Sequence, residues 1–203
     1  MGFFDALLGG KKKLRGVAPD RLFAMTTAYV TMEIELGMKS TGAAGIAFQS
    51  LETSDFEGIL RDAQELLAGT AQETGTELES SVDEFGYRWI ILRDPDFEDI
   101  VVSLNTLSTE LQGGGYGDRL LAAVFAFDYT DSSDSASMPN PSRQQKVYFI
   151  YNFKRGAFYP FVPSGGSKQR DTPRELRLKA QLQNEIPFEE DTTRWFPLWE
   201  IPL

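Results

Sequence analysis

Apolar residues recur at helical spacing in a first stretch that begins near residue 54. Ser54 and Glu57 have the spacing of a capping box, in which each side chain bonds the backbone N–H of the other residue. Gly69 can end the helix because glycine accepts the left-handed backbone conformation. The pattern predicts a helix whose apolar face lies in the core, and the residues on that face are Phe56, Ile59, Leu60, Ala63, Leu66 and Leu67.

Two further helices are predicted in the same way. In the second, Asp94 is the expected N-cap, Pro95 suits the first turn, and Gly113 ends the helix. A third is expected over residues 173–183, opened by a capping box between Thr172 and Glu175. The second helix carries an apolar stripe that we expect in the core, namely Phe97, Ile100, Val101, Leu104, Leu107 and Leu111.

Runs typical of strands lie between these helices. Two of them flank Asp83-Glu84-Phe85-Gly86, which is a hairpin signal. The last run contains Pro160, which has no N–H for a strand ladder, so that strand is expected at a sheet edge or with a bulge. The predicted strands cover residues 78–82, 87–92, 120–129, 146–153 and 157–162.

The assignment is harder for residues 24–49. Alternate residues are apolar as in a strand, although Met, Glu and Leu also favour helices. We favour a strand, which would pair across residues 37–42 with a second strand at 43–48. The alternating residues are Ala28, Val30, Met32, Ile34 and Leu36.

The interleaved helices and hairpins predict an α+β fold, with a mostly antiparallel sheet and about three helices packed on one face. We expect a single α+β domain over residues 20–203, preceded by an apolar and basic tail at residues 1–19. A run of Ser, Asp, Pro and Asn predicts a flexible loop at residues 130–145.

The composition restricts the chemistry that this domain can perform. The chain contains no histidine and no cysteine, which removes Ser–His and Cys–His pairs, disulfides, and metal sites built on nitrogen or sulfur. Its net charge is −10, and an acidic surface repels phosphate, so we expect no nucleic-acid partner. We also expect no cofactor. No apolar run approaches the roughly 18 residues that a membrane-spanning helix needs.

The N-terminal tail, residues 1–19, differs from the rest of the chain in hydropathy and charge. Five cations and two anions precede residue 22, so the remainder of the chain carries a net charge of −13. We interpret the tail as a contact for a partner or an anionic membrane; docking onto the protein's own surface and a disordered tail are the alternatives. The contact residues that we predict are Phe3, Phe4, Leu7, Leu8, Lys11, Lys12 and Lys13.

Simple energetics indicate that such a contact is weak. Each of the four apolar side chains gains roughly 1.5–3 kcal/mol on full burial, but ordering each residue of the tail costs on the order of 1 kcal/mol. Each cation adds about 1 kcal/mol at an anionic leaflet. We therefore expect an association that depends on salt and is helped by a partner protein.

Other motifs have plain structural interpretations that we prefer. Residues 164–168, Ser-Gly-Gly-Ser-Lys, could cradle an anion, but they lack the Walker spacing and indicate a turn. The acidic runs at residues 94–98 and 189–191 could supply paired carboxylates for hydrolysis or a metal site, but a solvated face explains them. The aromatic residues of 195–199 indicate either a strap that closes the core or an anchor for a partner.

Several sequence blocks together resemble the PspA-associated protein PspAB family, companions of the membrane-stress protein PspA (phage shock protein A). These blocks are residues 1–9, 41–48, 83–89, 151–163 and 194–199. They span nearly the whole chain, whereas residues 130–145 match nothing in the family pattern. The resemblance implies a cytoplasmic accessory protein of a PspA-type system, with a PspA-type protein as its partner. It supplies no catalytic residue.

Three functions from different classes remain open. The first, which we favour, is a non-enzymatic adaptor that binds a PspA-type protein and contacts the inner face of the cell membrane peripherally. The second is a chaperone-like module that binds peptides by strand addition at residues 157–162. The third is a hydrolase that uses Asp and Glu alone, for which no acid pair with a supporting shell emerges.

Overall fold

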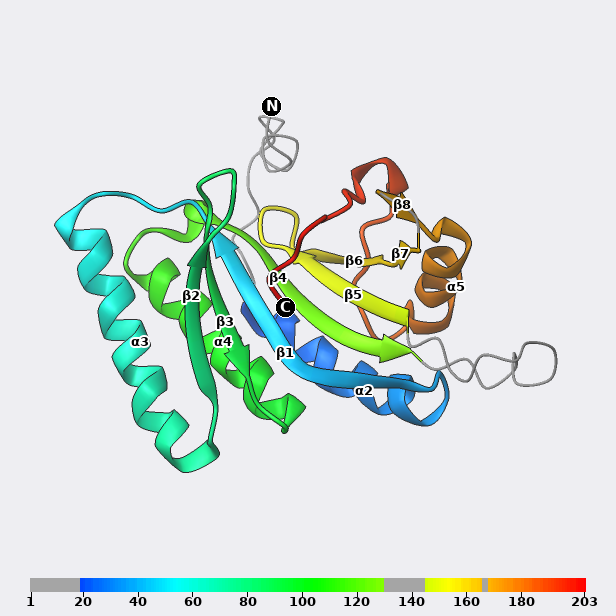
Figure 1. Ribbon diagram of the computed structural model, residues 1–203, viewed down its shortest axis with the longest axis horizontal. Helices are drawn as coiled ribbons and strands as arrows, with labels where there is room; N and C mark the ends of the chain where they lie inside the picture. Colours follow the sequence, from blue (N-terminus) through cyan, green and yellow to red (C-terminus); the bar gives the residue numbers. More distant parts are fainter. Residues whose placement is uncertain (1–18, 130–144, 166–167) are drawn as a thin grey trace.

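The computed structural model describes residues 19–129, 145–165 and 168–203. Within these ranges, six strands form one antiparallel sheet in the order β2-β3-β1-β4-β5-β6, as Figure 1 shows. The predicted α+β class is confirmed, and each predicted strand outside residues 28–36 is present. The strands are β1 (Met38–Phe48), β2 (Glu77–Val82), β3 (Arg88–Arg93), β4 (Leu120–Tyr129), β5 (Gln145–Asn152) and β6 (Ala157–Phe161).

Four α-helices of the described ranges pack on this sheet, one more than the sequence predicts. They are α2 (Ala24–Ile34), α3 (Ser54–Thr74), α4 (Phe97–Gly113) and α5 (Thr172–Leu182). Short 3-10 turns lie at Pro19–Phe23 (η1), Gly117–Arg119 (η2) and Thr192–Arg194 (η4). Two short strands, β7 (Pro163–Ser164) and β8 (Gln169–Arg170), form a separate ribbon between β6 and α5.

The additional helix is α2, and the strand predicted at residues 28–36 is wrong. The buried residues of α2 are Met25, Ala28 and Met32, whose spacing of three and four residues places them on one helical face. Val30 and Ile34, which the alternating pattern would also bury, are 57% and 77% exposed. The pairing predicted across residues 37–42 is wrong for the same reason, because β1 pairs with β3 and β4 instead.

The helices begin where predicted, but their caps come from neighbouring residues. The Asp96 side chain, and not that of Asp94, accepts a hydrogen bond from the backbone N–H of Glu98 at 2.9 Å. Asp94 is 3% exposed and accepts bonds from the Thr76 hydroxyl and the Asp96 N–H. Asp94 therefore ties the start of β2 to the β3–α4 connection instead of capping α4.

The two predicted capping boxes are wrong for a related reason. Helix α3 is capped by Thr53, whose hydroxyl accepts from the Phe56 N–H at 3.3 Å, and α5 is capped by Asp171, which accepts from the Arg174 N–H at 3.0 Å. The glutamates of the predicted boxes have other partners: Glu57 pairs with Arg88, and Glu175 is fully buried. Glu175 pairs with Arg170, five residues before it, and a carboxylate held by a cation outside its own helix is not free to turn back onto that helix.

The sheet buries both of its faces, but with different material. One face, the helix face, carries the larger core and packs against α2, α3, α4 and α5. Its centre is aromatic: the Phe97 ring lies 4.5 Å from that of Tyr29, 5.9 Å from Phe125 and 5.5 Å from Phe127 between centroids. Figure 1 shows α2 and α4 behind the sheet.

The opposite face, the front face, carries a second core without a helix. Side chains of β1, β3, β4, β5 and β6 on this face pack with Trp195 and Leu198. Phe196, Trp199, Ile201 and Leu203 lie against the same cluster. The C-terminal segment, residues 195–203, therefore covers this face, and it runs in front of the sheet in Figure 1. The prediction of a strap that closes the core is confirmed.

Strand β6 forms one edge of the sheet, as Pro160 predicts, and that edge is already occupied. Phe158 donates its N–H to Pro187 and accepts from Glu189 on the outer side, both at 2.8 Å. Alternate residues of an edge strand point their backbone groups outward, so Pro160 and Val162 are the next outward positions. Pro160 has no N–H, and Val162 bonds the Glu175 carboxylate through its N–H and Asp171 through its carbonyl.

Candidate functional site

The contact residues predicted from the sequence, Phe3, Phe4, Leu7, Leu8, Lys11, Lys12 and Lys13, lie outside the described residues, as does most of the predicted loop at 130–145. The site that the structure offers is instead a groove on the front face. It forms where the β2–β3 hairpin meets the C-terminal segment. We call it the hairpin groove.

The C-terminal segment is anchored near its start and at its last residue. The Trp195 indole N–H donates to the Glu189 carbonyl at 2.9 Å, and Arg170 donates to the Trp195 carbonyl at 2.6 Å. Leu203 lies over Gly45, where an added Cβ would come within 3.3 Å of the Leu203 side chain and of the Trp89 ring. The absence of a side chain at Gly45 therefore makes room for the end of the chain.

Arg170 links this anchor to a buried carboxylate. Its guanidinium lies 2.7 Å from a Glu175 oxygen, and the Glu175 side chain is fully buried. Burial raises the pKa of Glu175, while the hydrogen bonds from Arg170 and the Val162 N–H act in the opposite direction. One carboxylate thus joins α5, the outer edge of β6 and, through Arg170, the C-terminal segment.

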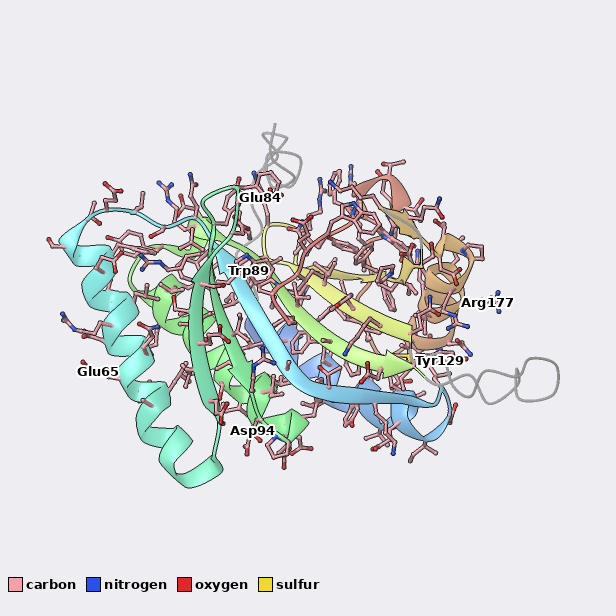
Figure 2. The ribbon with its side chains drawn as sticks, viewed as in Figure 1. Glu65, Glu84, Trp89, Asp94, Tyr129 and Arg177 are labelled. Atoms are coloured by element: carbon pink, nitrogen blue, oxygen red, sulfur yellow. The ribbon has the colours of Figure 1, made fainter. Side chains whose placement is uncertain are left out.

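The other wall of the groove is the hairpin turn, which Asp83 holds in place. One Asp83 oxygen accepts from the N–H groups of Phe85 and Tyr87 at 3.0 and 2.9 Å. The second oxygen accepts from the Trp89 indole N–H at 3.0 Å. Figure 2 shows Glu84 at the hairpin tip and Trp89 below it. The turn therefore fixes the orientation of the indole that forms part of the groove floor.

The groove between these walls has a volume of about 340 Å³ and a mainly apolar lining. Phe85 is 49% exposed, which is unusual for a large apolar side chain that lines a hollow. Trp199 lines the other side, and its ring packs edge-on against Phe161 with centroids 5.0 Å apart. The complete lining is Ser81, Val82, Asp83, Glu84, Phe85, Trp89, Lys168 and residues 197–202.

The charge at the groove is mainly negative. Asp83, Glu84 and Glu200 contribute three carboxylates, against the single ammonium group of Lys168 among the lining residues. Glu200 and Lys168 also have positive φ angles, 62° and 53°, and they are the two non-glycine residues with positive φ in the described ranges. Backbone of this kind clusters at binding sites more often than elsewhere. The groove thus combines an apolar floor with an acidic rim.

The comparisons place the whole chain in one family. The family model of PspA associated protein B, PspAB, matches residues 1–203. The chain belongs to the PspAB family. No curated protein and no solved structure matches it. The family resemblance drawn from the sequence blocks is confirmed, and the name of the family associates its members with PspA.

The acidic runs singled out in the sequence of this PspAB-family chain are engaged in structural contacts. Glu189 lies within 3.6 Å of both Arg155 and Arg194, and Asp191 lies 3.0 Å from Arg194. Hydrogen bonds from Thr193 lower the pKa of Asp191. Within the described ranges, no group of three or more acidic side chains could hold a metal ion.

Two other predicted features of this PspAB-family chain have structural roles. Pro163–Ser164 and Gln169–Arg170 pair as the β7–β8 ribbon, which supports the interpretation of the sequence between these strands as a turn. The β6 edge, proposed for strand addition, has its outward N–H groups occupied by the chain itself, which argues against that use. None of the helices in the described ranges combines the length and the hydrophobicity that a bilayer-spanning segment requires.

Sequence reasoning did not find the hairpin groove. Its residues come from positions 81–89, 168 and 197–202, which only the folded sheet brings together. One signal was available: Phe85 is a large apolar residue inside a predicted hairpin turn, where polar residues and glycine are usual. An aromatic side chain at that position has few neighbours of its own strand to cover it.

Proposed function

We propose that this PspAB-family chain is a non-enzymatic adaptor that binds a PspA-type protein from the cytoplasmic side and contacts anionic membrane peripherally through its tail. The observation that carries the proposal is the family match over residues 1–203, which includes the tail and the folded domain together. This match supports an association with PspA for a chain that contains both the tail and the folded domain.

The chemistry of the described residues supports binding in preference to catalysis. The buried carboxylates, Asp94 and Glu175, hold backbone and side-chain partners within the fold. The groove offers apolar side chains and carboxylates, and within the described ranges no group of three or more acidic side chains could hold a metal ion. Such a surface suits recognition of a segment that is apolar and basic.

The division of charge supports a tail that associates with a partner or lipid. The tail is cationic, whereas the remainder of the chain carries −13. Exposed charges interact over about 10 Å at ~0.1 M salt, so tail-dependent binding should weaken as the salt concentration rises. The acidic domain should oppose close approach to an anionic bilayer, which makes a protein partner important for membrane contact.

A pull-down with the purified PspA-type protein tests the proposal. The full chain is compared with a Phe3→Ser/Phe4→Ser variant and with a Lys11→Gln/Lys12→Gln/Lys13→Gln variant, each at about 0.1 and 0.5 M salt. We expect the lysine variant to lose most low-salt binding and the phenylalanine variant to lose the binding that remains at high salt. Val30→Ser/Ile34→Ser, on exposed positions of α2, is the matched control.

Two results would contradict the proposal. If the wild-type chain failed to retain the PspA-type protein at either salt concentration, the adaptor function would be wrong. If binding survived all five tail substitutions, the partner would bind the folded domain, and the role given to the tail would be wrong.

A further inference from the structure

We propose that the hairpin groove binds the N-terminal tail of its own chain, with apolar residues Phe3, Phe4, Leu7 and Leu8 in the groove and the following cations against its acidic rim. The proposal goes beyond the adaptor function because it concerns the protein without a partner. It gives the tail a resting position, from which a partner or a membrane must displace it.

The apolar parts of the tail and groove are complementary. The groove leaves Phe85 49% exposed beside Trp199 in a hollow of about 340 Å³, a volume in the range of pockets that hold small ligands. The tail presents two adjacent phenylalanines and two adjacent leucines within six residues. Water is removed from both surfaces if they pack together, at roughly 25 cal/mol for each Å² of apolar area.

The charges are complementary as well. The apolar residues of the tail are followed by Lys11, Lys12, Lys13 and Arg15, and the groove rim presents Asp83, Glu84 and Glu200. Lys168 is the one cation in the lining. Opposite charges that surround an apolar contact fix its orientation and oppose other occupants more than they add affinity. An anionic or purely apolar segment would match this groove less well.

The covalent connection permits the contact. Ten residues separate Leu8 from Pro19, where the described chain begins, and an extended stretch of ten residues spans up to about 35 Å. A domain of this size has a radius of gyration of about 16 Å. The tether therefore reaches across most of the molecule, including from one face of the sheet to the other.

The connection also compensates for weak affinity. A segment joined by a short flexible linker has an effective concentration in the millimolar range, so a contact with a dissociation constant near 1 mM is populated for much of the time. A competing partner that binds the tail in the micromolar range would still displace it. The groove would therefore hold the tail without preventing its release.

Cysteine cross-linking of the full chain tests the proposal cleanly because the sequence has no cysteine. The variant Leu8→Cys/Ser81→Cys places one thiol in the tail and one at the groove, because Ser81 lines the groove and pairs with Trp89 of the front face. The control Leu8→Cys/Ile34→Cys places the second thiol on the solvent-exposed side of α2, which packs on the helix face of the sheet. Ile34 is 77% exposed. Disulfide formation under mild oxidation is followed by peptide mass spectrometry in dilute protein without partner or lipid.

We expect the groove pair to form an intramolecular disulfide at least tenfold faster than the control pair. Adding Glu84→Lys/Glu200→Lys should slow the groove pair several-fold, whereas Glu33→Lys on the exposed side of α2 should not. Equal rates for the two pairs would overturn the proposal. Disulfides that join two chains would also overturn it, because they would show that the tail of a second copy occupies the groove. Melting temperatures check that each variant is folded.

This test is independent of the adaptor function. If the pull-down failed and cross-linking were as expected, the PspA-type partner would be wrong, and the groove would remain the proposed position of the tail. If the pull-down succeeded but the groove pair and the control pair cross-linked at equal rates, the partner would be supported, and docking of the tail in the groove would be wrong. The two proposals therefore fail by different measurements.

Discussion

The two faces of the sheet are buried by different means. The helix face packs against four helices, whose backbone groups bond one another within each helix. The front face is covered by residues 195–203, which have no regular structure. This segment is held by a hydrogen bond from Arg170 to the Trp195 carbonyl and by one from the Trp195 indole to the Glu189 carbonyl. The two faces therefore contribute differently. The helix face carries the larger continuous core, whereas the front face is covered by an irregular segment and has an accessible groove at its border.

Removing an aromatic side chain from the helix face should have the largest effect. Phe97→Ala deletes a ring that contacts Tyr29, Phe125 and Phe127, and we expect a loss of about 3–5 kcal/mol in the free energy of unfolding. Chemical denaturation followed by circular dichroism measures it. Val102→Ala, at a 46% exposed position of the same helix, should change stability by less than about 0.5 kcal/mol. Similar losses for both variants would show that α4 does not organise the core.

Breaking the link between the two faces should cost nearly as much. Glu175→Ala removes the carboxylate that bonds the Val162 N–H and pairs with Arg170, which leaves the half-buried guanidinium without its acidic partner. We expect a loss of about 3 kcal/mol, together with a change in the tryptophan fluorescence of the C-terminal segment. The matched control is Leu176→Ala, 46% exposed on the same helix. A variant as stable as the wild type would mean that Arg170 is held by its other contacts.

Displacing the cover of the front face should have a smaller and more local effect. Gly45→Val adds atoms where even a Cβ lies 3.3 Å from Leu203 and Trp89, and we expect a loss of about 1–3 kcal/mol. Carboxypeptidase should then release the last residues faster than in the wild type. The control is Gly58→Ala, where an added Cβ meets no atom within 4 Å. Its free energy of unfolding should increase by about 0.5–1 kcal/mol. Unchanged digestion in Gly45→Val would mean that Leu203 does not need this space.

A substitution in the groove itself should barely affect stability. Phe85→Ser changes a side chain that is 49% exposed, and we expect a change within about 0.5 kcal/mol. Trypsin should nevertheless cut after Lys11, Lys12, Lys13 and Arg15 several-fold faster, because the tail has lost part of its docking surface. Val30→Ser, 57% exposed on α2, is the control. Equal cleavage rates in Phe85→Ser and the wild type would contradict docking of the tail.

The same contrast explains what the sequence could predict. Helix α4 and strand β4 were predictable because their own residues carry the pattern: Phe97, Ile100 and Leu104 repeat at helical spacing, and β4 is apolar on both faces. Helix α2 was not, because Met32 fits both periods, and the exposure of Ile34 depends on packing against α4. The caps moved by one or two residues because neighbouring Asp and Thr side chains compete for the same N–H groups.

The groove required the tertiary structure. Nothing in the local sequence indicates that Phe85 would meet residues near Trp199, more than a hundred positions later, or that a glycine at position 45 would receive Leu203. The composition of the tail alone leads us to propose it as a binding segment. Its proposed partner surface could not be predicted in this way, because that surface exists only after the hairpin and the C-terminal segment come together.

The occupied edge at β6 also bears on how this protein resists aggregation. Growth of a sheet from molecule to molecule needs a strand with free outward N–H groups. Phe158 and Val162 have already donated theirs, and Pro160 has none. Lateral growth is therefore directed to the opposite edge, β2, where Glu77 and Glu79 would bring carboxylates into any new pairing. β2 is the strand from which we expect ordered aggregates to begin when Glu77 and Glu79 are both replaced by glutamine.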